Sequence, residues 1–219
     1  MNQREEIEFK TLDGLTLRGT LYPSPRRHHD TRSKPFRHGI CQFFQEAGIN
    51  VLIYDPRTID PAQQMRNYHD ALTFLKADAR IDHKRIALWG FSFSGAVALA
   101  AGALDKLAAL VLTICPLTIW ELSPSRMRSV MAKVMLDRES QLKGNRPFSI
   151  PMVAGHDELR LINESKEIIP DFEVTTTFQT YYNIMAWSPF ETLRHLGPTP
   201  VLLVTPEDDR ISPSQKQRS

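Results

Sequence analysis

Hydrophobic and polar residues alternate in two short stretches at the start of the chain. Residues 6–12 and 15–22 each show a period of two, which is typical of half-buried strands, and Asp13-Gly14 between them favours a tight hairpin turn. Residues 49–54 are a continuous apolar run, as in strands buried on both faces of a parallel sheet. We therefore expect an antiparallel hairpin, followed by a strand in the parallel centre of a sheet.

Helical periodicity separates the apolar runs. Residues 36–47 are expected to form an amphipathic helix that ends at Gly48, with an apolar face made of Ile40, Phe43, Phe44 and Ala47. A longer helix is expected to begin with Asp60 as its N-cap and to run to about Ala77, burying Met65, Tyr68, Leu72 and Leu75. Further apolar runs at residues 86–89, 107–114 and 200–204 predict strands. This alternation predicts an α/β fold with a mostly parallel sheet and right-handed crossovers.

Two further helical patterns lie between the last two of these strands. Residues 120–144 space Met127, Val130, Met131, Val134 and Met135 for one helix face, and residues 178–196 form a second helical pattern that Pro189 is expected to break. We expect one domain over residues 1–219, in which residues from about 120 to 196 form a helical, cap-like insertion after the sixth strand.

The charge balance, the apolar stretches and the cysteines of the chain limit the classes of function to consider. Lysine and arginine number 27 against 25 acidic residues, so the net charge of +2 gives no general attraction to nucleic acid or membranes. The basic run at residues 23–37 is expected to be a solvated loop. The first residues lack the apolar core of a secretory signal, and no apolar stretch reaches the length of a membrane span, so we expect a soluble, intracellular protein. Cys41 and Cys115 are expected to be free thiols.

The candidate chemistry centres on Ser92. Residues 86–89 predict a strand, Gly90-Phe91-Ser92-Phe93-Ser94-Gly95 a tight turn, and residues 96–104 a helix. Such a turn exposes a serine hydroxyl, and the helix N-terminus behind it offers amides, first that of Phe93, to an oxyanion. The common pattern is G-x-S-x-G, and Ser94 stands here at the place of its second glycine, so Ser92 is the candidate nucleophile. The alternative is an ordinary connection between a strand and a helix.

A candidate acid follows the last strand. Asp208 and Asp209 lie shortly after residues 200–204, which is where the acid that orients a catalytic histidine belongs in a Ser-Asp-His order. Asp209 is preferred because the Arg-Ile-Ser-Pro segment after it starts a new helix. The alternative is that both aspartates only cap this helix.

Five segments together resemble α/β-hydrolases of fungal secondary-metabolite clusters. They are EEIEFKTLDGLTLRGTLYP, EAGINVLIYDPR, IDPAQQMRNYHDALTFL, RIALWGFSFSG and AWSPFETL…PTPVLLVTPEDDRISP. The chain is most similar to polyketide transferases and to hydrolases of host-selective toxin pathways. The resemblance implies a serine enzyme acting on an ester or thioester of a polyketide-like metabolite, free or bound to a carrier protein or coenzyme A. It implies no metal or organic cofactor, and either a cytoplasmic or a peroxisomal location, although the chain ends without an S-K-L signal.

The chain also departs from this family. Family members carry a hydrophobic strand and a Gly-containing oxyanion loop before the EAGINV segment, where this chain has the basic residues 23–37. Losing this strand would leave a gap beside residues 49–54, with exposed apolar surface and open strand edges. The family's catalytic histidine lies beyond the acid, whereas this chain ends ten residues after Asp209. Among its histidines, His156 is the one we would test as a substitute. A shortened, non-catalytic protein that binds a ligand or partner, or a copy without function, is the alternative.

Overall fold

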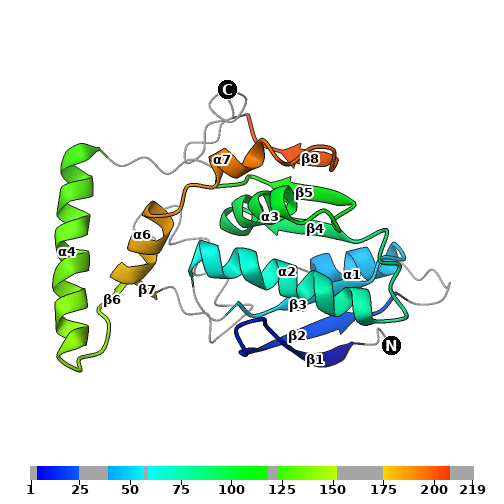
Figure 1. Cartoon of the computed structure of the whole chain (residues 1–219), viewed down its shortest axis with the longest axis horizontal. Helices are drawn as coiled ribbons and strands as arrows, with labels where there is room; N and C mark the ends of the chain where they lie inside the picture. Colours follow the sequence, from blue (N-terminus) through cyan, green and yellow to red (C-terminus); the bar gives the residue numbers. More distant parts are fainter. Residues whose placement is uncertain (1–3, 25–38, 57–58, 118–122, 152–174, 208–219) are drawn as a thin grey trace.

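Two three-stranded sheets form the centre of the molecule. The computed structural model describes residues 4–24, 39–56, 59–117, 123–151 and 175–207. One sheet is antiparallel, with β2 between β1 and β3, and the other is parallel, with β5 between β4 and β8 (Figure 1). Their strands are β1 (Glu5–Lys10), β2 (Thr16–Tyr22), β3 (Val51–Tyr54), β4 (Ala87–Phe91), β5 (Leu110–Ile114) and β8 (Val201–Val204).

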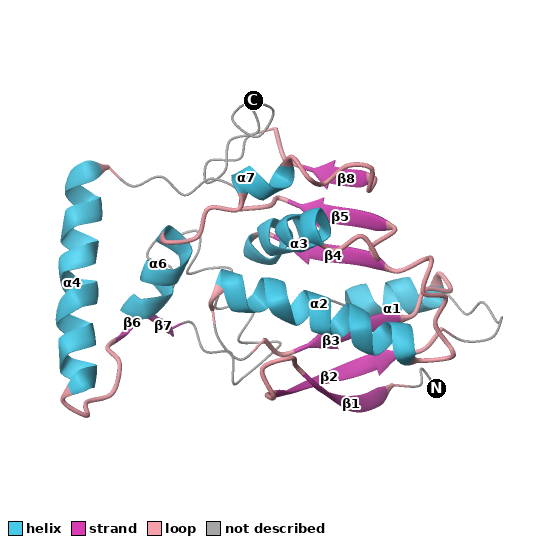
Figure 2. Cartoon of the chain, viewed as in Figure 1, coloured by secondary structure: helices cyan, strands magenta, loops and turns pink. Residues whose placement is uncertain are grey.

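Helices connect and cover these strands, as Figure 2 shows. The described helices are α1 (Gly39–Glu46), α2 (Pro61–Ala77), α3 (Phe93–Leu104), α4 (Pro124–Leu142), α6 (Phe178–Met185) and α7 (Phe190–Leu193). A separate hairpin pairs β6 (Ser149–Pro151) with β7 (Thr175–Thr177), which the sequence did not predict. None of the helices in the described ranges is both long and apolar enough to cross a bilayer.

Small side chains let α3 approach the parallel sheet. Residues 95–103 of this helix are all buried, and all of them are glycine, alanine, valine or leucine. A Cβ atom on Gly102 would lie 2.4 Å from Cγ2 of Val111 on β5, so glycine is required for this contact. The larger core cluster joins α2, α3, β4 and β5, and it includes Leu72, Ile86, Leu88 and Leu99. The helix that follows Ser92 is therefore fixed against the strands on both sides of that residue.

Several predicted elements are confirmed. The hairpin forms with β1 and β2 antiparallel. Asp60 caps α2, because its Oδ1 accepts a 3.0 Å hydrogen bond from the Gln63 amide, and Leu72 of that helix is buried. The second helical pattern breaks before Pro189, between α6 and α7. Cys41 is a buried thiol whose pKa is raised by burial, and neither Cys41 nor Cys115 forms a disulfide, as expected.

Two packing predictions are wrong. Residues 49–54 were expected in the parallel centre of a sheet, but β3 pairs antiparallel with β2, and Ile53 is 49% exposed. The apolar face expected for α1 is also incorrect, since Phe43 is 61% exposed while Cys41 and Gln45 are buried. No described strand lies on the second edge of β3, and a cavity of about 610 Å³, lined in part by Ile53, lies there. The gap predicted from the missing strand is thus confirmed.

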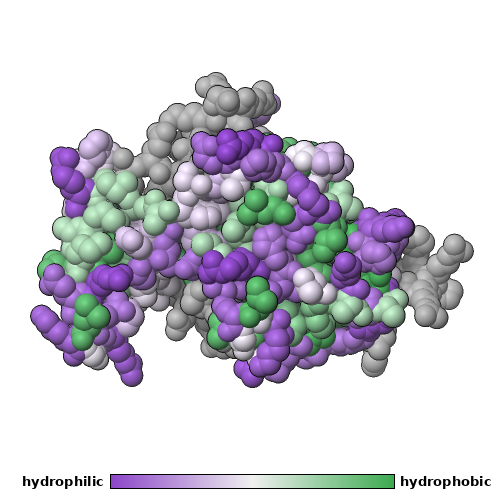
Figure 3. Space-filling view, in the orientation of Figure 1, coloured by the Kyte–Doolittle hydropathy of each residue, from purple (hydrophilic) through white to green (hydrophobic). Residues whose placement is uncertain are grey.

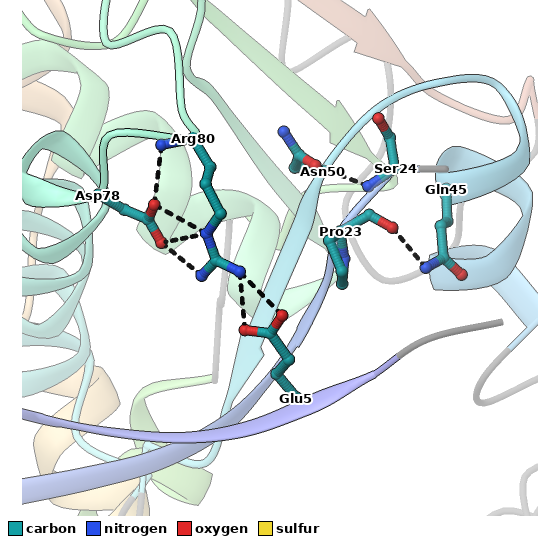
Figure 4. A network of polar contacts seen from close by, with 7 residues as sticks. All are labelled: Glu5, Pro23, Ser24, Gln45, Asn50, Asp78 and Arg80. Atoms are coloured by element: carbon teal, nitrogen blue, oxygen red, sulfur yellow. Dashed lines mark hydrogen bonds and ion pairs between the residues drawn. The ribbon is translucent and has the colours of Figure 1, made fainter. Parts of the chain in front are cut away.

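Hydrogen bonds and ion pairs connect the antiparallel sheet to α1 and to the end of α2 (Figure 4). The Arg80 guanidinium lies between the carboxylates of Asp78, at 2.6 Å, and Glu5, at 2.8 Å, and so links the end of α2 to β1. Hydrogen bonding from Arg80 lowers the pKa of the Asp78 carboxyl. Gln45 of α1 donates to the carbonyl of Pro23, and the Ser24 amide donates to Asn50 before β3.

The insertion extends away from the sheets. The helix α4 packs on α6, with Val134 buried in the predicted apolar face, while Met135 of that face is 43% exposed. Asp137 is also buried there, where its two carboxylate oxygens accept hydrogen bonds from the Phe148 amide and the Gln141 side chain. The insertion was expected after the sixth strand, but among the described strands it follows the fifth, β5. Figure 3 shows hydrophobic residues in small groups among hydrophilic ones on the face that carries α2 and α3.

Candidate active site

Ser92 lies at the turn from β4 into α3, as the sequence predicts. Its backbone has φ 53° and ψ −120°, a combination that non-glycine residues seldom adopt and that is often found at functional sites. Its amide donates to the Ile114 carbonyl at the end of β5, and its carbonyl accepts from the amides of Gly95 and Leu117, each at 2.9 Å. Backbone hydrogen bonds to the end of β5, to α3 and to the segment that follows β5 thus hold the unusual conformation in place.

Two glycines make this turn sterically feasible. A Cβ atom on Gly90 would lie 2.3 Å from the carbonyl oxygen of Ser94 and 2.7 Å from the Cα atom of Gly95. A Cβ atom on Gly95 would lie 3.1 Å from Pro116, in the segment that follows β5. The strand and the helix therefore approach backbone to backbone at this point. Gly90 and Gly95 are therefore required for this close approach.

The structure separates the two serines of the turn. The Ser94 hydroxyl accepts a 3.0 Å hydrogen bond from the Phe91 amide and donates a 2.9 Å bond to the Phe91 carbonyl. The Ser92 hydroxyl and the Phe93 amide, by contrast, make no hydrogen bond with another residue in the described ranges. Ser92 is partly exposed and lies at the N-terminal end of α3. Its hydroxyl and the neighbouring amide are thus available to a bound molecule.

The carboxyl ends of the parallel strands meet beside Ser92. The Cys115 amide donates to the Val204 carbonyl at 2.7 Å, which joins the ends of β5 and β8. Cys115 itself has φ 47°, so a second residue of this edge takes an unusual backbone conformation. Nothing in the sequence predicts this conformation, because neither a cysteine nor the proline after it favours a positive φ. Asp208 and Asp209, which follow β8, lie outside the described residues, as does His156.

The described histidines all lie away from Ser92. His69 Nδ1 is 3.0 Å from the carboxylate of Asp105, which caps the C-terminal end of α3, and α3 is about 18 Å long. The His195 carbonyl accepts a hydrogen bond from Lys106, so it is also at that end. His83 precedes β4, at the opposite end of the strand from Ser92. The described residues therefore bring no imidazole to the candidate nucleophile. The sequence did not predict the pair of His69 and Asp105.

Comparison with known proteins shows which family this architecture represents. Residues 25–219 match the model of the alpha/beta hydrolase family. The chain belongs to the alpha/beta hydrolase family. This α/β-hydrolase is 40% identical over 248 residues to a thiohydrolase of Eupenicillium brefeldianum, with 98% of the chain and 80% of that protein covered. It is 34% identical over 241 residues to the polyketide transferase grgF of a Penicillium species, with 98% and 82% covered.

Solved structures agree with this assignment. The crystal structure of the alpha/beta hydrolase GrgF from Penicillium sp. sh18 has a TM-score of 0.85 and 33% identity, covering 99% of this α/β-hydrolase and 84% of that chain. The structure of DcsB in complex with its substrate analogue has a TM-score of 0.86 and 29% identity, with the same coverage. The family resemblance stated from the sequence is confirmed, and the chain is a member of a group of fungal hydrolytic and acyl-transfer enzymes.

Proposed function

We propose that this protein is a serine-dependent hydrolase or acyltransferase that acts on an ester or thioester of a polyketide-like metabolite. The observation that carries the proposal is the Ser92 hydroxyl at a strained turn, beside the Phe93 amide at the start of α3, since neither group bonds to another described residue. The names of the relatives, thiohydrolase and polyketide transferase, support the substrate class.

In the proposed reaction, the Ser92 Oγ attacks the acyl carbonyl and forms an acyl-enzyme. The Phe93 amide donates a hydrogen bond to the oxyanion, aided by the positive end of the α3 dipole. Asp209, five residues after β8, is proposed to orient the histidine that takes the serine proton, and His156 is the first histidine to test in this role. Water then releases the acyl group in hydrolysis, whereas an alcohol accepts it in transfer.

The insertion is proposed to cover this site. We propose that residues from about 120 to 196 belong to the same domain as Ser92; within this stretch, the described helices α4 and α6 pack on each other. A covering segment would exclude water from the acyl-enzyme and so favour transfer over hydrolysis.

A fluorophosphonate probe tests the nucleophile directly. We expect the purified wild-type chain and Ser94→Ala to be labelled, because the Ser94 hydroxyl is occupied by the Phe91 backbone. Ser92→Ala should not be labelled, and its thioester hydrolysis should fall by up to about a million-fold, as when the serine of a protease is removed. Circular dichroism of each variant confirms folding. Equal labelling of Ser92→Ala and wild type would refute the assignment.

A second candidate function rests on the positions of the described histidines. Since none of His69, His83 and His195 lies at Ser92, a protein that binds an acyl ligand without turning it over is the alternative. It predicts that a folded wild-type chain is not labelled, and that an acyl ligand binds Ser92→Ala and wild type equally. Labelling of the wild type that is lost in His156→Ala would instead support the enzyme and identify its base.

A further inference from the structure

A cavity lies between the two sheets, where no described strand joins them. Its volume is about 610 Å³, and its walls include Leu52, Ile53 and Tyr54 of β3 and Ala87, Leu88 and Trp89 of β4. In Figure 2 the helix α2 lies in front of the space between these two strands. The cavity is therefore a slot with one open strand edge on each side, and we call it the inter-sheet slot.

The walls of the inter-sheet slot present unpaired backbone. Among the described strands, β3 pairs only with β2, and β4 pairs only with β5, so each has one edge that faces the slot. The Tyr68 hydroxyl donates to the Trp89 carbonyl at 3.0 Å, which satisfies one polar group of β4 from a side chain. Buried amides and carbonyls that lack partners are costly. The edges therefore favour an occupant that supplies both donors and acceptors.

A side chain of the slot also lacks a partner. The indole Nε1 of Trp89 is buried and makes no hydrogen bond with another described residue. An indole N–H that is left unpaired in this way costs stability, and a carbonyl oxygen in the slot would satisfy it. A hydrocarbon chain would fill the apolar space but would leave this donor and both strand edges unpaired.

The region of the Eupenicillium thiohydrolase that matches this chain is longer than the chain itself. The alignment with the Eupenicillium thiohydrolase extends over 248 residues, although this chain has 219. The relative therefore contains residues, within the matched region, that have no counterpart here. The chain's own residues 23–37 are a poor substitute, because placing their arginine and lysine side chains between two strands would bury unpaired charge.

We propose that the inter-sheet slot binds one extended apolar segment of another polypeptide, which pairs as a strand with β3 and β4 at once. The β3 and β4 strands have 4 and 5 residues, so the segment needs about five residues and spans about 17 Å. It is uncharged and rich in valine and isoleucine, because the slot is apolar. The proposal goes beyond the proposed function and does not depend on the chemistry of Ser92.

A synthetic peptide tests this. The probe has a five-residue core of alternating valine and isoleucine, flanked by lysines for solubility, and its control carries N-methyl groups on alternate core residues, which removes donors from one edge. The protein carries Trp120→Phe and Trp187→Phe, so that Trp89 is its sole tryptophan. We expect the probe to change Trp89 fluorescence in a saturable way and to raise the melting temperature. The N-methylated control should bind at least about tenfold more weakly.

Two lysine variants locate the binding site. Ile53 in the slot and Leu202 on the outer strand β8 are both 49% exposed, so Ile53→Lys and Leu202→Lys are matched changes. We expect Ile53→Lys to weaken probe binding by at least about tenfold and Leu202→Lys to leave it unchanged. Loss of binding in Leu202→Lys alone would place the peptide on β8 and overturn the proposal. Equal binding of the N-methylated control, or no binding to the folded protein, would overturn it as well.

Discussion

At the scale of single residues, the turn around Ser92 depends on a position without a side chain. The backbone of residues 94 and 95 occupies the space where a Cβ atom of Gly90 would stand, at 2.3 Å from the Ser94 oxygen. Backbone atoms cannot move aside as the end of a flexible side chain can. Any larger residue at this position must therefore displace the start of α3, and with it Ser92.

Gly90→Ala is therefore expected to lower the free energy of unfolding by about 3 kcal/mol, at the upper end for overpacking a tight contact. It should also remove fluorophosphonate labelling. The control is Gly197→Ala, since no atom lies within 4 Å of the added methyl group there. Chemical denaturation of both variants measures the difference. A Gly90→Ala protein as stable as Gly197→Ala would contradict the contact.

Much of this residue-level picture could be predicted from the sequence, but not all. The motif was sufficient to prefer Ser92 over Ser94, because the spacing of strand, turn and helix is local. The conformation of Cys115 and the pairing of His69 with Asp105 could not be predicted, because they depend on contacts between segments far apart in the chain. Asp209 stays a prediction.

At the scale of elements, α2 is connected to the slot edge of β4 through Tyr68. Its hydroxyl donates to the Trp89 carbonyl, and burial raises the pKa of Tyr68 to about 12. Burial of its own hydroxyl likewise raises the pKa of Tyr54 on β3. Because the folded protein holds the Tyr68 proton more tightly than the unfolded chain, Tyr68 stabilises the fold fully below pH 10. This contribution is lost as the pH rises from 10 to 12.

Tyr68→Phe should lower the free energy of unfolding by about 1–2 kcal/mol at pH 7, because the Trp89 carbonyl loses its partner. The difference from wild type should shrink between pH 10 and 12, where the wild-type tyrosine loses its advantage. Urea denaturation over this pH range measures both effects. Tyr182→Phe on α6, which is 37% exposed, is the matched control and should change little. A difference that stayed the same from pH 7 to pH 12 would contradict the raised pKa of Tyr68.

Sequence periodicity predicted where the helices and strands lie in the chain better than it predicted which elements pack against them. The helix α2 and the strands β4, β5 and β8 form close to the expected residues because capping and apolar runs are local signals. The buried face of α1 and the neighbours of β3 were predicted wrongly, because both depend on contacts between segments that are not adjacent in the chain. The resemblance indicated that this strand is missing, but periodicity alone could not.

At the scale of the whole molecule, apolar strand residues are exposed at an outer edge as well as in the slot. All four residues of β8 are between 39% and 49% exposed, which is unusual for a strand of a parallel sheet. Exposed apolar edges of this kind promote association between copies.

We expect the wild-type chain to associate at increasing protein concentration, and Leu202→Lys to raise the concentration needed. A lysine on an edge strand opposes pairing with another edge. Light scattering against concentration measures this. Leu136→Lys on α4, where the leucine is 61% exposed outside the sheets, should have a smaller effect. If both variants behaved as wild type does, β8 would not be the associating surface.

The pairing of the strands also determines where backbone amides meet solvent. In the described sheets only β2 and β5 have a neighbour on both sides, so β4, which leads to Ser92, is bonded like the outermost strand of a sheet. In deuterated water, the amides of β5 that bond within the sheet should keep their protons longest, while slot-facing amides of β3 and β4 should lose theirs early. Hydrogen exchange would then show that β3 and β4, which line the slot, are less protected than β5.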